Sequence, residues 1–90
     1  MDLKPSAASM APISVSSEGK KLAKAIGTAI RARRKLRGWS QEALAERSNL
    51  HPNQIGFLER GDRIPNVQTL HQVAVALKVK LSDLLRDSNL

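Results

Sequence analysis

The most distinctive chemistry in this 90-residue chain lies in the segment 51–60, which combines side-chain amides with a guanidinium group. Asn53 and Gln54 each carry an amide that can donate and accept hydrogen bonds together, as the edge of an adenine requires. Arg60 could reach a phosphate or the edge of a guanine. These residue types indicate contacts to a nucleic acid.

A short helix would sort this segment into two faces. The outward face would carry Asn53, Gly56, Phe57 and Arg60, and the inward face Ile55, Leu58 and Glu59. Phe57 is open to two interpretations, because it either packs into the core or contacts the methyl group of a thymine. Gly56 either lets DNA approach the backbone closely or is a tolerated weakness in the helix. The functional interpretation depends on this orientation of the helix.

Three neighbouring residues add to the same surface. His51 is expected to cap the helix or to contact DNA, and we count it with Pro52 among the residues that face the bases. A metal site is not expected, because His71 is the only other histidine and the chain has no cysteine. Gln41 would lie in the first turn of the preceding helix, where it could bind a phosphate or simply face solvent.

The positive charge is concentrated in one stretch. The net charge is +7, and the segment 20–37 holds eight of the fifteen lysines and arginines but no acidic residue. Such a stripe attracts a polyanion, because neutralised phosphates release their counterions, although it could also be a solvated helix surface. Lys24 and Arg31 are the expected phosphate contacts within it, together with Arg60 and Arg63 farther along the chain.

Helical periodicity and capping signals predict the elements that must position these side chains. The expected helices span about 20–37, 41–48 and 52–60, followed by one after Asn66 that carries Leu70 to Leu77 and a short one after Ser82. The expected N-caps are Ser40, His51 and Asn66, and the expected C-terminal stops are Gly38 and Gly61. The pairs Trp39 with Leu44 and Leu50 with Ile55 have the spacing of hydrophobic staples.

Composition limits the fold to a small helical domain. Aromatic residues make up 2% of the chain, so the core must be aliphatic, which suits helices packed on helices. Ninety residues support one domain, expected over 20–90. Residues 1–19, rich in Ser, Ala and Pro, are expected to form a flexible, disordered tail or an arm that reaches DNA. The predicted fold class is all-α.

Several sequence segments, taken together, resemble a known family. They are 30–34 (Ile-Arg-Ala-Arg-Arg), 38–45 (Gly-Trp-Ser-Gln-Glu-Ala-Leu-Ala), 55–61 (Ile-Gly-Phe-Leu-Glu-Arg-Gly), the pair Pro65 and Asn66, and the stretch from Leu70 to Leu77. In this order and spacing they are similar to the Cro and phage-repressor type of helix-turn-helix, the xenobiotic-response-element family. The resemblance covers about residues 24–86. It implies a five-helix, lambda-repressor-like domain that binds operator DNA, usually as a symmetric dimer, and acts on transcription.

The resemblance also implies roles for individual residues. Gln41 would contact a phosphate and Arg63 would approach the DNA backbone. The residues lying over the bases would be Pro52, Asn53 and Phe57. The base preference cannot be transferred from relatives, because polar residues are common in the family where this chain has Pro52 and Phe57.

One ion pair is expected inside the domain. A carboxylate at the inward-facing Glu59 would need a cationic partner, because burying an unpaired charge is costly. Arg34, late in the first helix, is the candidate, and the family resemblance implies the same pair. Two residues depart from the family pattern, since Arg33 stands where an apolar residue is usual and Lys78 where a glycine commonly ends the fourth helix.

Other classes of function fit the sequence less well. Catalysis would need convergent titratable groups in a cleft, so we expect no enzyme, no cofactor and no small-molecule ligand. A membrane surface is not expected as a partner because the basic segment lacks aromatic anchors. RNA is disfavoured because two aromatic residues are too few to stack unpaired bases. The alternative is an antitoxin-type autoregulator that binds a partner protein, or an RNA- or protein-binding adaptor with the same fold.

The expected partner is a double-stranded DNA operator. The run from Ser48 to His51 resembles the controller proteins of restriction-modification systems, and a general repressor is the other subtype considered. A homodimer is expected because one short helix makes few base contacts. Its self-complementary patch, unless these residues merely close the core, would be Val79, Leu81, Leu84, Leu85 and Leu90. With no cysteine and no apolar span, a cytoplasmic, nucleoid-associated protein is expected.

Overall fold

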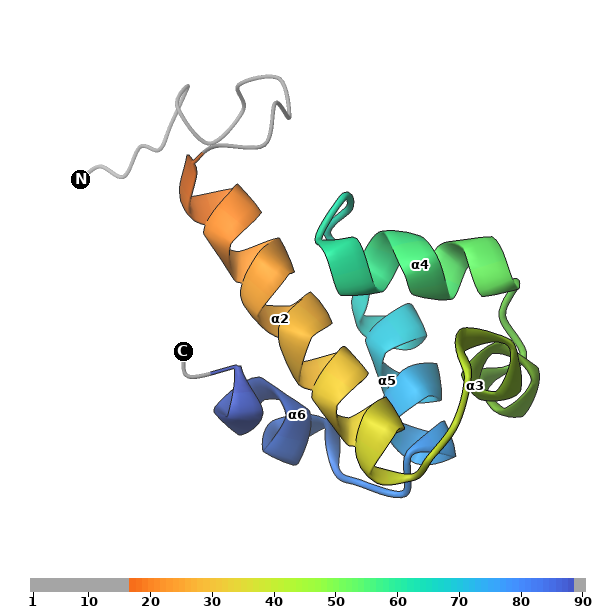
Figure 1. Cartoon of the computed structure of the whole chain (residues 1–90). Helices are drawn as coiled ribbons and strands as arrows, with labels where there is room; N and C mark the ends of the chain where they lie inside the picture. Colours follow the sequence, from red (N-terminus) through yellow and green to blue (C-terminus); the bar gives the residue numbers. More distant parts are fainter. Residues whose placement is uncertain (1–16, 89–90) are drawn as a thin grey trace.

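The computed structural model describes residues 17–88, which form five helices and no strand (Figure 1). The helices are α2 (Ser17–Leu36), α3 (Gln41–Ser48), α4 (Pro52–Arg60), α5 (Val67–Ala76) and α6 (Leu81–Asp87). The all-α prediction is confirmed, and α3 and α4 have the predicted bounds.

The first helix begins earlier than predicted. The sequence predicts a tail through residue 19, but α2 starts at Ser17. Glu18 lies in its first turn, where the positive end of the helix dipole stabilises a carboxylate. Gly19 weakens a helix by only about 1 kcal/mol, so it does not stop this one. The tail prediction is therefore wrong for residues 17–19, and its remainder, 1–16, lies outside the described residues.

Short-range signals mark the helix ends where the sequence predicts them. Ser40 Oγ accepts a hydrogen bond from Ala43 N at 3.0 Å at the start of α3, and Asn66 Oδ1 accepts one from Thr69 N at 2.8 Å at the start of α5. Gly61 ends α4 in the left-handed conformation, with a φ of 74°. Only a residue without a Cβ adopts this conformation at little cost.

The start of α6 differs from the prediction. The helix begins at Leu81 and not after Ser82. Asp83 Oδ2 accepts a hydrogen bond from Lys80 N at 3.1 Å, so the Asp83 side chain caps the backbone at the start of the helix. The predicted start after Ser82 is wrong, because the Asp83 carboxylate binds the backbone N–H of Lys80 and the helix begins one residue before Ser82.

The two departures from the family pattern are accommodated locally. Lys78 adopts a φ of 59°, the left-handed conformation that a glycine would take more easily. Arg33 turns toward α6, where its Nε lies 2.5 Å from Asp87 Oδ2. This hydrogen bond raises the pKa of Arg33 and lowers the pKa of the Asp87 carboxyl. Arg33 thus joins α2 to α6 and does not enter the core.

All five helices contribute to one aliphatic core. Its largest fully buried side chains are Ile30, Leu44, Ile55, Val73, Leu77 and Leu84. Trp39 and Leu50, the first residues of the two expected staples, are partly buried and pack against this core. Because Leu84 is fully buried, the C-terminal apolar stretch closes the core at that position.

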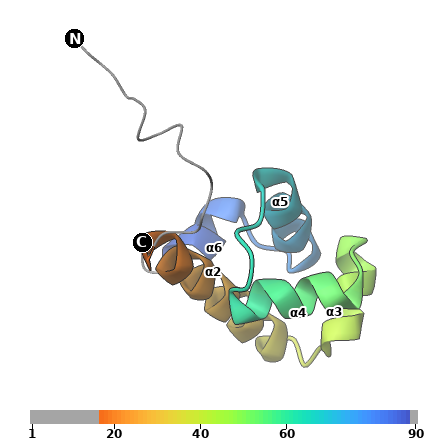
Figure 2. The same ribbon diagram turned by 90° about the horizontal axis from the view of Figure 1, so that it is seen from above.

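The helix α4 lies between α2 and α3, as Figures 1 and 2 both show. The crossing of α2 and α4 is very close at Gly27. A Cβ atom at this position would lie 2.2 Å from Leu58 O and 2.6 Å from Glu59 O. Backbone atoms of α4 therefore occupy the space that any larger residue at position 27 would need.

We expect Gly27→Ala to lower the free energy of unfolding by about 1–3 kcal/mol, because the added methyl group forces the two helices apart. Gly56→Ala is the matched control in α4. The atom nearest to a Cβ at position 56 would be Arg60 Nη1, at 3.2 Å, which is the end of a flexible side chain and can move aside. This variant should gain up to about 1 kcal/mol from helix propensity. Denaturation followed by Trp39 fluorescence measures the free energy of unfolding of both variants. If Gly27→Ala is as stable as Gly56→Ala, the close crossing of the two helices is contradicted.

Candidate nucleic-acid interface

A tight turn, residues 49–51, joins α3 to α4. Asn49 takes the left-handed conformation, with a φ of 60°, and its backbone N–H donates to carbonyls at the end of α3. From α5, Gln72 Nε2 donates a hydrogen bond to Ser48 O at 3.0 Å. The mutual orientation of the two short helices is therefore fixed by the turn and by α5.

A reciprocal cap holds the start of α4. His51 Nδ1 accepts a hydrogen bond from Asn53 N at 3.0 Å, and Gln54 Oε1 accepts one from His51 N at 3.0 Å. The prediction that His51 caps this helix is confirmed, and Pro52 occupies the first turn as predicted. Because the cap occupies one lone pair of the Gln54 side-chain oxygen, a paired contact from Gln54 to an adenine would have to use the second.

The inward face of α4 is as predicted, since Ile55, Leu58 and Glu59 are buried. On the opposite side Asn53 is exposed, and its side-chain amide makes no hydrogen bond with residues 17–88. The donor and the acceptor of Asn53 are therefore both available to a base edge.

The outward face departs from the prediction at Gly56, which is buried. Gln41 Oε1 and Arg60 Nη1 lie 3.8 Å and 3.2 Å from the position that a Cβ of Gly56 would occupy. The prediction that Gly56 faces outward is wrong, because a glycine has no side chain to keep its neighbours from covering it.

Arg34 of α2 and Glu59 of α4 form the expected ion pair. Arg34 Nε donates to Glu59 Oε2 at 2.6 Å, and Arg34 Nη2 donates to Glu59 Oε1 at 2.9 Å. Their side chains are 10% and 3% exposed, so the pair is shielded from solvent. Arg34 Nη1 also donates to Trp39 O at 2.7 Å. The hydrogen bond with Glu59 raises the pKa of Arg34.

Gln41 joins this pair from α3. Its Nε2 donates to Glu59 Oε1 at 3.1 Å, which engages one of its two amide hydrogens. The other hydrogen can donate to an anion. Side chains from α2, α3 and α4 thus meet at Glu59.

Four of the five residues expected to contact phosphate share one hollow. This hollow of about 420 Å³ is lined by Lys24, Thr28, Arg31, Gln41, Glu59, Arg60 and Asp62. Its two carboxylates are paired, Glu59 with Arg34 and Asp62 with Arg60, whose Nε lies 2.8 Å from Asp62 Oδ2. Lys24 and Arg31 have no such partner among the described residues. The hollow is therefore a positively charged surface beside α4.

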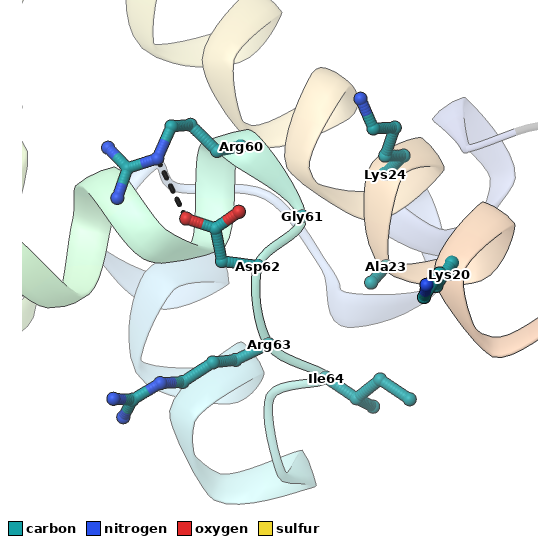
Figure 3. A pocket seen from close by; sticks show the side chains of 8 residues that line it. All are labelled: Lys20, Ala23, Lys24, Arg60, Gly61, Asp62, Arg63 and Ile64. Atoms are coloured by element: carbon teal, nitrogen blue, oxygen red, sulfur yellow. Dashed lines mark hydrogen bonds and ion pairs between the residues drawn. The ribbon is translucent and has the colours of Figure 1, made fainter. Parts of the chain in front are cut away.

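Arg63, the fifth expected phosphate contact, lies outside this hollow, in the connection between α4 and α5. Arg60 and Arg63 line a second hollow, of about 320 Å³, together with Lys20 and Lys24 of α2. Figure 3 shows that the side chains of Arg60 and Arg63 extend to the same side of the connection, away from Lys20. The Cζ atoms of Arg63 and Arg60 lie 4.6 Å and 5.3 Å from the centre of the Phe57 ring. Sequence reasoning missed these contacts, and their one signal was the spacing of an aromatic residue and an arginine by three positions.

Other kinds of site are not found within residues 17–88. No cluster of three or more His, Cys, Asp or Glu side chains in this range could hold a metal ion. No helix in the same range is long and apolar enough to cross a membrane.

Two short helices at a fixed orientation, the second of which presents polar side chains outward, define a helix-turn-helix domain. A family model described as helix-turn-helix matches residues 30–84, and the chain belongs to this family. The resemblance to the Cro and phage-repressor type is thereby confirmed. Residues 17–29, the N-terminal part of α2, lie outside the match.

Individual relatives agree with this assignment. The chain is 36% identical over 61 residues to the HTH-type transcriptional regulator SutR of Escherichia coli. The aligned region covers 68% of this chain but only 34% of SutR. The regulator ClgR of Corynebacterium glutamicum has a TM-score of 0.72 at 32% identity, over 76% of this chain and 72% of that one. The restriction-modification controller protein C.AhdI of Aeromonas hydrophila has a TM-score of 0.67 at 32% identity, over 69% of this chain and 94% of that one.

We expect Glu59→Gln to lower the free energy of unfolding by about 3 kcal/mol, because it leaves the buried Arg34 guanidinium without a counter-charge. Glu46→Gln is the matched control, since Glu46 is exposed on α3 and its carboxylate has no hydrogen-bond or ion-pair partner among residues 17–88. It should change stability by less than about 0.5 kcal/mol. Urea denaturation measures the free energy of unfolding of both variants. If Glu59→Gln has as small an effect as Glu46→Gln, the ion pair does not hold the domain together.

Proposed function

We propose that this protein binds double-stranded DNA in a sequence-specific manner and regulates transcription, with α4 lying in the major groove. The observation that carries the proposal is the exposed amide of Asn53 on a helix whose opposite face is buried. A major groove admits a helix and presents base edges that an uncommitted amide can contact. Membership of the helix-turn-helix family supports this DNA-binding role, which involves no catalysis.

The base-contacting residues in this proposal lie at the start and along the outward face of α4. Asn53 would contact a base edge with both its donor and its acceptor. Gln54 and His51 would contribute the polar groups that the cap leaves free, namely the Gln54 amide N–H groups and the His51 Nε2. Pro52 and Phe57, both partly buried, would supply apolar contacts to the bases.

The phosphate contacts would come from the positively charged hollow beside α4. Lys24, Arg31 and Arg60 would neutralise backbone phosphates, and Gln41 would donate its free amide hydrogen. Arg63 would contact the backbone from the connection after α4. Such contacts fix the position of the protein on DNA and provide affinity for any sequence. A regulator of this kind would act at the nucleoid.

Selection of bound fragments from random DNA would provide the cognate site, and two variants then test the assignment. Asn53→Ala should weaken binding to the cognate site by about 1–3 kcal/mol and leave binding to random-sequence DNA nearly unchanged, because it removes a base contact alone. Gln41→Ala should weaken binding to both, since a phosphate contact is independent of sequence.

Fluorescence anisotropy at one fixed salt concentration measures these affinities, with thermal melting as the control for folding. If Asn53→Ala weakens both kinds of DNA equally, Asn53 does not belong to the base-contacting set.

We propose further that the protein binds its operator as a homodimer, because one short helix specifies few bases. The large apolar side chains left exposed include Val67 and Val75 on α5 and Leu85 on α6. Of the residues expected in the interface, Leu84 is buried in the core and Leu90 lies outside the described residues. The exposed apolar side chains of α5 and α6 are therefore the candidate contact surface.

Val75→Glu should abolish the dimer, because it places a charge within this surface, whereas Leu36→Glu should leave it intact. Leu36 is a suitable control because it is 82% exposed at the end of α2. Analytical ultracentrifugation with and without operator DNA measures the stoichiometry. A wild-type monomer in both states would refute the dimer.

A further inference from the structure

Phe57 has an unusual environment for an aromatic residue on an outward helix face. Two guanidinium groups lie against its ring, that of Arg63 at 4.6 Å and that of Arg60 at 5.3 Å from the ring centre. A cation within about 6 Å of a ring centroid is attracted by the ring quadrupole. The ring therefore contacts two cations from different segments, one at the end of α4 and one in the following connection.

The backbone and one acidic residue bring these segments together. Asp62 N donates a hydrogen bond to Phe57 O at 3.0 Å, so the chain after α4 turns back over the aromatic residue. The Asp62 carboxylate accepts a hydrogen bond from Arg60 Nε at 2.8 Å and reduces the repulsion between the two arginines. Figure 3 shows Asp62 next to Arg60, with Arg63 extending to the same side.

Arg63 is the unsatisfied member of this cluster. Its guanidinium makes no hydrogen bond or ion pair with residues 17–88, and it lies over the Phe57 ring. A guanidinium that stacks on a ring keeps its N–H groups free, because these point outward in the plane of the group. Such groups can form two parallel hydrogen bonds to a phosphate.

We propose that Phe57 is a positioning residue, whose ring holds Arg60 and Arg63 as a preorganised clamp for a DNA backbone phosphate. The inference rests on the proposed DNA binding and gives Phe57, in addition to its apolar contact with the bases, a role that is independent of base sequence. Without the ring, both long side chains would have to be ordered when DNA binds, which weakens the contact.

The direct test measures binding to a random-sequence DNA duplex over a series of salt concentrations. Phe57→Leu keeps an apolar side chain but removes the ring, and it should weaken this binding about threefold to tenfold. Phe57→Tyr keeps the ring and should bind within about twofold of the wild type. Trp39 fluorescence and thermal melting establish that each variant is folded.

A second measurement separates positioning from general packing. In a background that carries both Arg60→Gln and Arg63→Gln, Phe57→Leu should change the affinity by less than about twofold, because no guanidinium remains for the ring to hold. Arg63→Lys offers an independent test that leaves the aromatic residue intact. It keeps the charge but loses the planar guanidinium over the ring, and it should weaken binding in the same direction as Phe57→Leu.

Replacing thymine by deoxyuridine in the selected site tests the base contact of Phe57 separately from the clamp. If Phe57→Leu leaves binding to random-sequence DNA unchanged, and removal of thymine methyl groups weakens the wild type alone, the base contact is the sole role of Phe57 and the clamp is overturned. An equal effect of Phe57→Leu with and without the two arginines overturns it as well. Failure of the wild type to bind any duplex would instead refute the proposed function.

Discussion

The buried ion pair between Arg34 and Glu59 is the interaction on which the rest of the structure depends. It joins α2 to α4 through two hydrogen bonds, and Gln41 brings α3 to the same carboxylate. A charge left alone in this environment would be strongly destabilising, so α4 cannot rotate about its axis without breaking the pair. The pair therefore determines which face of α4 points outward, and with it the position of Asn53.

Close packing acts together with this ion pair. Gly27 lets the backbones of α2 and α4 approach until no Cβ would fit between them. The short distance also brings Lys24 and Arg31 of α2 beside Gln41 and Arg60, so that residues distant in sequence form one positively charged hollow. The charge of α2 is thereby directed toward the side where α4 presents its polar groups.

Several polar side chains of the interface have two tasks. His51 and Gln54 cap α4, and Gln41 holds Glu59, before any DNA is present. Each keeps at least one donor for a further partner. This arrangement restricts the side chains that would contact DNA, and a restricted side chain loses less entropy on binding. Asn53 differs because its amide is committed to no other group within the described part of the chain.

The sequence by itself determined the features that depend on near neighbours along the chain. The bounds of α3 and α4, the caps at Ser40 and Asn66 and the stop at Gly61 follow from hydrogen bonds within a few residues, and the family motifs implied the pair of Arg34 and Glu59. Local signals were misleading at the starts of two helices: Gly19 does not stop α2, and Asp83 binds Lys80 N so that α6 begins before Ser82. Only the tertiary structure decided that Gly56 is covered, that Arg33 turns toward Asp87, and that Phe57 lies under two arginines. These features depend on where side chains of different segments meet, and residue spacing does not specify that.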